Sequence, residues 1–344
     1  MIGDRLKLLS NPGIFGSAAL LAGIALLASR LLLYPPGNAF VFIEVGILFL
    51  FYGLLVLGLN LQYGFTGIIN FGHVLFFGVG GYATAMLVAP ESARGIALGL
   101  PWPIGLAGAI IAAALVAGIV GFASLPLREE YVAIATLAAA ELFTDVTANL
   151  PSITGGAIGY VSIPQPINIW AGGHYGTFLT STLLVMIGVL SFGYVVFRRL
   201  TDGPYGRVLR AIRADKEITD TIGKHVFRYE MEVFVFAAIV AAIAGSIYAL
   251  FIGAAAPGLY TADVTFLLWI GMLVGGAGNH RGVLAGLGIV MAFELLTRFL
   301  NDLPYYTSQQ FGALRLAMIG LLLIVIVRYR PEGIWGNAKE QGIE

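Results

Sequence analysis

Long apolar runs recur along almost the whole chain and constrain its fold more than any other feature. A helix needs about 20 predominantly apolar residues to cross a bilayer, and ten such stretches stand in the sequence: 14–33, 40–61, 68–88, 103–125, 131–149, 179–197, 231–252, 263–279, 282–300 and 311–328. Only 11% of the residues are charged, against about 25% in soluble domains. The sequence therefore predicts an all-α polytopic membrane protein with about ten transmembrane helices, in one domain of residues 1–344 surrounded by membrane lipid.

Two of the predicted spans and the N-terminus leave alternatives open. The third and eighth spans each contain a glycine cluster, so either could be a broken or re-entrant helix. Arg5 and Lys7 precede the first apolar run, as in a signal peptide, but that run is longer than the roughly 7–15 residues of a signal-peptide core. We therefore expect residues 14–33 to be retained as the first helix.

The distribution of basic residues predicts the orientation. With the N-terminus inside and the helices alternating, most of the 19 Lys and Arg residues fall in cytoplasmic segments, as the positive-inside rule requires. The loop at 150–178 is rich in Gly and Pro, has no Lys or Arg, and falls outside. We therefore expect an N-in, C-in topology, with 150–178 as an extracytoplasmic loop that is either a plain connection or a docking surface.

Residues 198–230 form a long charged segment that contrasts with the rest of the chain. Within it, RAIRADKEITDTIG (210–223) follows Pro204, which suits a first helical position, and ends on Gly223, which suits a C-terminal cap. Val208 with Ile212, and Ile218 with Ile222, lie four apart, as on a helix face. These features favour a cytoplasmic amphipathic helix, or helix pair, that docks in a groove of a partner. A loop that only fixes topology and a helix on the lipid surface are the alternatives.

Ionisable and polar side chains within the spans are further candidates, because a charge in hydrocarbon is unfavourable by at least about 2.5–3.5 kcal/mol. Glu141 and Asp145 lie four apart and share a helix face, where they line a polar pathway or form structural ion pairs. Asn70 and His73 stand among glycines, where a broken helix would offer backbone groups to a zwitterionic solute; capping of helix ends is the alternative. The remaining charges in the spans are Glu44, Glu294 and Arg315.

Composition argues against several other classes of site. A net charge of zero gives no indication of a nucleic-acid partner. The chain has no cysteine, so disulfides and thiolate-bound metals are excluded, and its four scattered His make no convincing metal site. Asn279 and His280 are expected to form a tight turn, and Gly282 and Gly286 a close-packing G-x-x-x-G pair.

Six segments, in the same order along the chain, resemble one known family. They are NLQYGFTGIINFGHVLFFGVGGYATA (60–85), LPLREEYVAIATLAAAELF (125–143), SITGGAIG (152–159), RAIRADKEITDTIGK (210–224), LVGGAGNHRGVLAGLGIV (273–290) and RYRPEGIWG (328–336). They are similar to the permease subunits of ABC importers for branched-chain amino acids, and to the longer of the two permease types in such importers. The resemblance covers roughly residues 40–336.

The resemblance implies a coupling helix around Ala211 to Gly223 that fits a groove on a cytoplasmic ATPase. Where ABC permeases commonly have E-A-A-x-x-x-G, this chain keeps Glu217 and Gly223 but replaces the alanines by Ile218 and Thr219. The residues assigned to ATPase coupling are Arg210, Arg213, Asp215, Glu217, Asp220 and Gly223. The sequence has no G-x-x-x-x-G-K-[ST] phosphate loop. We therefore expect ATP-Mg to be used by a partner subunit, and this chain to bind no cofactor and to be no enzyme.

The implied assembly is an importer in a prokaryotic cell membrane. It would contain a second homologous permease subunit, two cytoplasmic ATPase subunits and an extracytoplasmic solute-binding protein. The expected function is movement of branched-chain or other hydrophobic amino acids into the cytoplasm by alternating access. The same machinery carrying urea, short amides or a sugar is the nearest alternative. A gradient-driven secondary transporter is the alternative of another class, and it would leave the charged segment without a role.

Overall fold

The computed structural model describes residues 39–91, 93 and 95–298 and, further on, residues 317, 318, 320, 321, 324, 328–330 and 332–336. The predicted first span, 14–33, lies outside the described residues, as do Arg315 and most of the predicted tenth span. The chain divides into two compact units, one of residues 50–268 and one that combines the segments before and after it.

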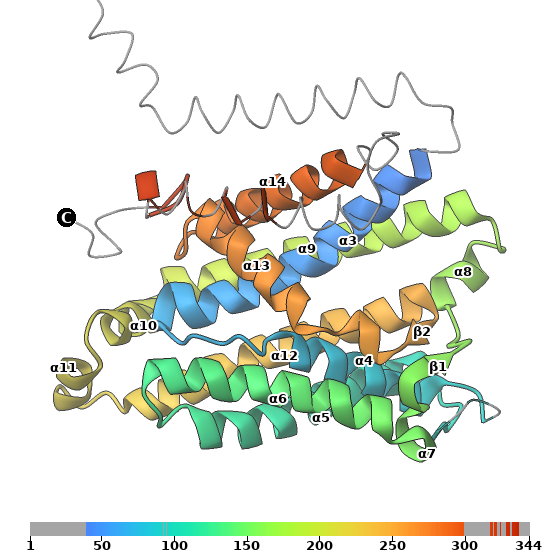
Figure 1. Ribbon diagram of the computed structural model, residues 1–344, viewed down its shortest axis with the longest axis horizontal. Coiled ribbons are helices and arrows are strands. Elements are labelled where there is room, and N and C mark those ends of the chain that lie inside the picture. Colours follow the sequence, from blue (N-terminus) through green and yellow to red (C-terminus); the bar gives the residue numbers. More distant parts are fainter. Residues whose placement is uncertain are drawn as a thin grey trace, which may run out of the picture. The chain divides into compact units, whose positions relative to one another are not determined.

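Helices make up almost all of the described structure (Figure 1). In chain order the elements are α3 (Ala39–Leu59), η2 (Asn60–Phe65), α4 (Val74–Val88), α5 (Trp102–Ser124), α6 (Glu129–Asn149), α7 (Pro151–Thr154), η3 (Gly156–Ile158), β1 (Tyr160–Val161), α8 (Pro166–Trp170), α9 (Tyr175–Asp202), α10 (Pro204–Ala214), α11 (Lys216–Thr221), α12 (Val226–Ile252), β2 (Ala254–Ala255), η4 (Pro257–Leu259), α13 (Ala262–Gly275) and α14 (His280–Arg298).

Six helices of the described part are long and apolar enough to cross a membrane. They are Phe40–Phe65, Trp102–Ser124, Glu129–Asn149, Tyr175–Asp202, Val226–Ile252 and Pro257–Gly275. The predicted third span is shorter than expected, since α4 has only 15 residues, and the predicted ninth span corresponds to α14. A helical polytopic membrane fold is therefore confirmed, while the count of ten spans and their orientation stay predictions.

The core of the unit 50–268 is the contact of α12 with α4 and α5 (Figure 1). The backbones approach so closely that a Cβ on Gly245 would overlap the carbonyl group of Phe77. Thr84 of α4 and Ser246 of α12 are joined by a hydrogen bond of 2.6 Å between their hydroxyl oxygens. Small residues permit this approach, as is usual between membrane helices.

The predicted third span, 68–88, is helical only from Val74, where α4 begins, so its first six residues are not part of the helix. The helix that begins as α3 ends as the π-helix η2, and α4 begins only at Val74. We call residues 66–73 the broken segment. Its backbone is held by side chains: the Phe71 N–H donates to Thr136 of α6 (3.1 Å) and the Gly72 N–H to Oδ1 of Asn70 (2.9 Å).

Residues 150–178, together with β2 and η4, form what we call the Gly-rich cap. Its strands pair antiparallel, with Tyr160 opposite Ala255. Tyr160 is fully buried, and its hydroxyl donates to the carbonyl oxygens of Ile96 (2.7 Å) and Ile153. Gly159 has a φ of 69°, and a Cβ there would overlap the Ala255 carbonyl group. The cap therefore depends on backbone contacts, and residues 150–178 include no Lys, Arg, Asp or Glu.

In the other unit, the turn between α13 and α14 is built around Asn279. Its Oδ1 accepts hydrogen bonds from the N–H groups of Arg281 (3.0 Å) and Gly282 (3.2 Å), and its Nδ2 donates to the Trp335 carbonyl (2.9 Å). Gly282 and Gly286 lie directly against the backbone of α13. The predicted tight turn and the predicted close-packing glycine pair are both confirmed.

Candidate functional site

The predicted coupling segment folds into two helices, α10 and α11, at one end of the unit 50–268 (Figure 1). The single coupling helix expected around Ala211 to Gly223 is therefore wrong, because the chain turns at Asp215. Pro204 begins α10, as predicted. Asp215 separates the helices and caps α11, because its carboxylate accepts the Ile218 N–H at 2.9 Å. Gly223, with a φ of 82°, follows the end of α11. Its N–H donates to the backbone carbonyl of Asp220, and the N–H of Lys224 donates to the backbone carbonyl of Thr219. This pair of hydrogen bonds is a Schellman cap. We call α10, α11 and the adjoining first turns of α6 and α12 the charged end.

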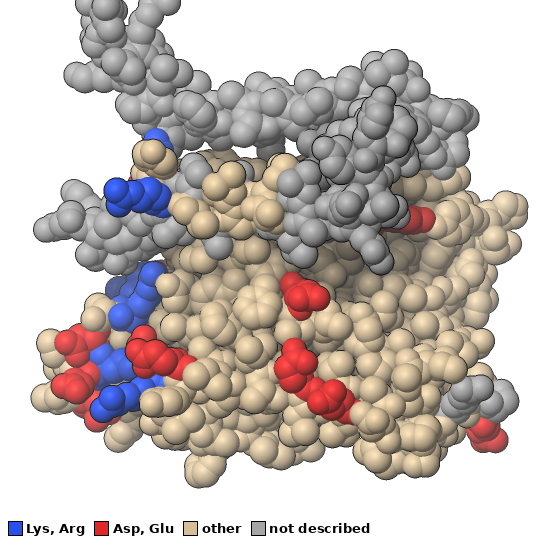
Figure 2. Space-filling model, viewed as in Figure 1, with Lys and Arg blue, Asp and Glu red and all other residues tan. Residues whose placement is uncertain are grey.

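Figure 2 shows blue and red side chains gathered together at the charged end of an otherwise mostly uncharged surface. The Gly-rich cap lies at the opposite end of α6 and α12, since α6 runs from Glu129 to Asn149 and α12 from Val226 to Ile252. The charges of the described residues are therefore concentrated where α10 and α11 meet the membrane-length helices.

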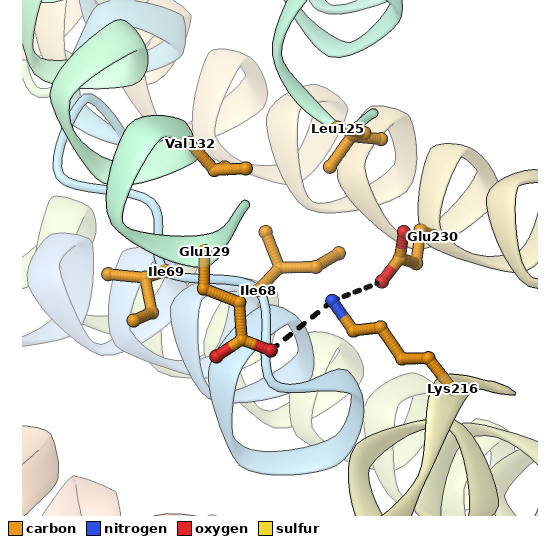
Figure 3. A pocket seen from close by; sticks show the side chains of 7 residues that line it. All are labelled: Ile68, Ile69, Leu125, Glu129, Val132, Lys216 and Glu230. Atoms are coloured by element: carbon orange, nitrogen blue, oxygen red, sulfur yellow. Dashed lines mark ion pairs between the residues drawn. The ribbon is translucent and has the colours of Figure 1, made fainter. Parts of the chain in front are cut away.

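Lys216 connects α11 with the first turns of α6 and α12. Its Nζ lies 3.0 Å from a carboxylate oxygen of Glu230 in the first turns of α12, and 3.4 Å from one of Glu129 at the start of α6. Figure 3 shows the ammonium between the two carboxylates, in a small pocket also lined by Ile68, Ile69, Leu125 and Val132. We call Glu129, Lys216 and Glu230 the Lys216 bridge.

The Lys216 bridge is more than a surface ion pair, because Glu230 is almost fully buried. Its side chain is 5% exposed, whereas those of Lys216 and Glu129 are 37% and 55% exposed. Removing one partner of a buried pair leaves an uncompensated charge. Glu129 also lies in the first turn of α6, where the helix dipole favours negative charge. The bridge thus ties α11 to two membrane-length helices at once.

The two helices of the coupling segment differ in what they leave exposed. Leu209 and Ile212 of α10 are fully buried against this chain. In α11, Ile218 and Ile222 are 63% and 67% exposed, and Glu217 and Asp220 are exposed beside them. The apolar face of α10 is therefore already occupied, and α11 presents the apolar positions that a partner could cover.

The predicted coupling arginines point into this chain. Arg213 donates to the Gly64 carbonyl oxygen (2.6 Å) and Arg210 to the Thr201 carbonyl oxygen (3.2 Å). Tyr205, which begins α10 after Pro204, donates to the Glu232 carboxylate (3.2 Å); burial and that carboxylate raise the pKa of its phenol. Of the six residues assigned to coupling, four are exposed: Asp215, Glu217, Asp220 and Gly223.

The four candidate pathway residues fall into two groups. Glu141 and Asp145 are exposed on one face of α6. Asn70 and His73 are fully buried in and beside the broken segment, where Asn70 donates to Gln62 (3.0 Å) and His73 packs against Gly58. In the part of the chain that the structure describes, no group of three or more His, Asp or Glu residues could hold a metal ion.

Sequence reasoning missed the Lys216 bridge and the π-helix. Each carboxylate of the bridge lies one or two residues before a predicted span, 131–149 or 231–252, which is a usable signal. Nothing in the sequence pairs these two carboxylates with Lys216, which lies 87 and 14 residues away along the chain.

Comparison with known proteins identifies the family. The sequence family described as "Branched-chain amino acid transport system / permease component" matches residues 41–327, which is most of the chain. The chain belongs to this family. It is a multi-pass membrane permease of a branched-chain amino acid ABC transport system, and hence a transporter subunit rather than an enzyme.

Individual permeases of this family are similar to the chain over most of their length. The probable branched-chain amino acid transport permease protein LivM of Methanocaldococcus jannaschii is 28% identical over 82% of this chain and 90% of its own. The high-affinity LivM permease of Salmonella typhimurium is 27% identical, covering 87% and 71%. The LivH permease of Escherichia coli is 28% identical, covering 85% and 93%. The predicted resemblance to the longer permease type, LivM, is confirmed.

Proposed function

We propose that this permease is one of two homologous permease subunits of an ATP-driven importer that moves branched-chain or other hydrophobic amino acids into the cytoplasm by alternating access. The observation that carries the proposal is the exposed face of α11, which the Lys216 bridge connects to α6 and α12. An exposed apolar pair with acidic neighbours on a short helix suits a groove on another protein. The family match spans residues from both compact units, which supports a single permease domain.

We further propose that the charged end is cytoplasmic and the Gly-rich cap extracytoplasmic. The positive-inside rule supports this, because residues 198–230 hold eight of the chain's 19 basic residues and residues 150–178 hold none. Two cytoplasmic ATPase subunits would bind at α11, one for each permease, and use ATP-Mg. A solute-binding protein would deliver solute at the cap. Similarity to both LivM and LivH proteins supports a second, related permease as the partner.

The acidic face of α6 supports a polar environment within the membrane. Glu141 and Asp145 are exposed in a membrane-length helix, and carboxylates facing lipid would be strongly unfavourable. We propose that this face borders the solute pathway shared with the second permease. Asn70 and His73, which are buried in the broken segment, would support this pathway without lining it. Competition of branched-chain amino acids with urea, short amides and sugars in uptake assays tests the proposed solute class.

A pull-down in mild detergent tests the docking of an ATPase. Wild type is compared with Glu217→Arg plus Gly223→Trp, which changes the exposed face of α11. The matched control is Glu91→Arg plus Gly99→Trp: Glu91 is exposed, and Gly99 and Gly223 both have positive φ and open space around a Cβ.

We expect wild type and the control to recover a nucleotide-binding subunit, and the α11 variant to lose it. Equal recovery from both variants would contradict the proposed docking site. If wild type recovers no such subunit in several detergents, the proposed assembly with two ATPase subunits fails.

A further inference from the structure

The π-helix η2 is an unusual element at the end of a membrane-length helix. π-Helices hold well under about 1% of residues and often mark functional sites. Here Asn60–Phe65 end a membrane-length helix directly before the broken segment. The carbonyl oxygens of Gln62 and Tyr63 accept backbone N–H groups of Ile68 (3.0 Å) and Gly67 (3.1 Å). The Gly64 carbonyl oxygen accepts instead from a different helix, through Nη1 of Arg213 at 2.6 Å.

Arg213 is well placed to hold the end of η2. It lies on α10, whose position is set by the buried side chains of Leu209 and Ile212. Its guanidinium carbon stands 5.8 Å from the centre of the Tyr63 ring, and that of Arg210 stands 6.0 Å from the Phe65 ring. A cation at a helix C-terminus complements the helix dipole, and a guanidinium over an aromatic face adds to it.

The same turn of η2 contacts the interior of the unit on its other side. Gln62 is fully buried and accepts a hydrogen bond from Asn70 of the broken segment (3.0 Å). Its Nε2 also reaches the Phe234 carbonyl of α12 (3.5 Å). Asn70 in turn accepts the Gly72 N–H just before α4 begins. One helical turn thus connects α10 with the broken segment and with α12.

We propose that Arg213 is a positioning residue that holds η2 in its π-helical form. When α10 and α11 move, Arg213 releases the Gly64 carbonyl, η2 leaves its π-helical form, and the change reaches the broken segment. A π-helix bonds residue i to i+5 and an α-helix bonds i to i+4. Conversion therefore shifts the register by one residue, which is about 100° of helix rotation. Such a rotation turns Gln62 away from Asn70 and rearranges residues 66–73. This inference rests on the proposed coupling role of α10 and α11, and adds the route from them into the spans.

The absence of native cysteine makes the broken segment open to site-specific labelling. We would place a single cysteine at half-buried Ile69 in the complete transporter and measure its alkylation rate with and without ATP and vanadate. Solute moved per ATP hydrolysed and retention of the ATPase subunits are measured on the same samples. The variants are Arg213→Gln, the conservative Arg213→Lys, and Arg207→Gln as an exposed control on α10.

We expect Arg213→Gln to retain the ATPase, to lose the nucleotide-dependent change at position 69, and to move about tenfold less solute per ATP, within the usual range of coupling between sites. Arg213→Lys should recover part of both signals, because its ammonium still donates to the Gly64 carbonyl. Arg207→Gln should behave as wild type. A purely structural role for Arg213 would lower the amount of folded complex without changing solute per ATP or the labelling response.

A second variant decides the matter if Arg213→Gln fails to fold. Gln62→Met has similar volume, breaks the bond to Asn70 and leaves α10 and α11 unchanged, so we expect the same loss of coupling. Wild-type coupling and labelling in folded Arg213→Gln, or in folded Gln62→Met, would overturn this inference alone. If wild type binds no ATPase, the proposed function fails and this inference fails with it.

Discussion

The charged end and the Gly-rich cap lie at opposite ends of α6 and α12, and each is held together by a different kind of contact. At the charged end, long side chains make the connections: Lys216 reaches two carboxylates, and Arg213 reaches a carbonyl of η2. At the cap, the backbone makes them, through the pairing of β1 with β2 and the close approach of Gly159 to Ala255. Long side chains change partners at small cost, whereas closely packed backbones do not. We therefore expect the charged end to move more readily than the cap.

The largest expected effect tests the rigidity of the cap. Gly159→Ala places a Cβ against the Ala255 carbonyl at a positive φ, so we expect it to lower the free energy of unfolding by about 3 kcal/mol or more. Gly99→Ala is the matched control, with a φ of 61° and no atom within 4 Å of the added Cβ. Thermal unfolding in detergent measures both. If the two variants are equally stable, the cap tolerates movement and the comparison fails.

The next effect concerns the Lys216 bridge. Lys216→Met leaves buried Glu230 unpaired, and we expect a loss of about 2 kcal/mol, below the roughly 3–5 kcal/mol of a fully buried pair, because Lys216 is 37% exposed. The double variant Lys216→Met, Glu230→Gln should recover part of this loss, since it removes the orphaned charge. Exposed Lys224→Met serves as the control. A loss that the second substitution leaves unchanged would show that the charge of Glu230 is not involved.

A smaller effect is expected from the cap tyrosine. Tyr160→Phe removes a hydroxyl that donates to buried carbonyl groups, so we expect a loss of about 1–2 kcal/mol. Burial raises the pKa of the Tyr160 phenol above its usual value. A raised pKa means that the stabilisation is complete below about pH 10, the ordinary pKa of tyrosine, and is lost as pH rises through the folded-state value. Unfolding of wild type and variant from pH 7 to 11 checks this: a difference that grows above pH 10 would contradict it.

The smallest expected effect is a difference between the two regions in how their amide hydrogen exchange responds to ionic strength. Between about 0.1 M and 1 M salt the Debye length falls from about 10 Å to 3 Å, which weakens the more exposed contact of Lys216, the one with Glu129, but not the backbone pairing of the cap. We expect amide hydrogen exchange in residues 215–224 to rise about twofold, and that in residues 155–161 to stay constant, since exposed ion pairs contribute at most about 1 kcal/mol. Equal responses of the two regions would remove this distinction.

Much of the fold follows directly from the sequence. Six of the ten predicted spans coincide with membrane-length helices, and their ends fall within a few residues of the predicted ones. The caps of the coupling segment at Pro204 and Gly223 are also where the sequence places them. The sequence does not distinguish half-buried Val208 and buried Ile212 of α10 from the exposed Ile218 and Ile222 of α11, because both pairs have the same spacing. Burial depends on which surface of the neighbouring helices each face meets.

The sequence by itself determined that the chain is a helical membrane protein, that its charge is collected in one segment, and that this segment is helical. These properties depend on local composition and on the need to satisfy backbone hydrogen bonds within hydrocarbon. Only the tertiary structure decided that Lys216 stands between Glu129 and Glu230, and that Arg213 meets a π-helix at Gly64. Those partners lie 14, 87 and 149 residues apart in the sequence, and they meet only because the packing of η2, α6, α10, α11 and α12 brings them together.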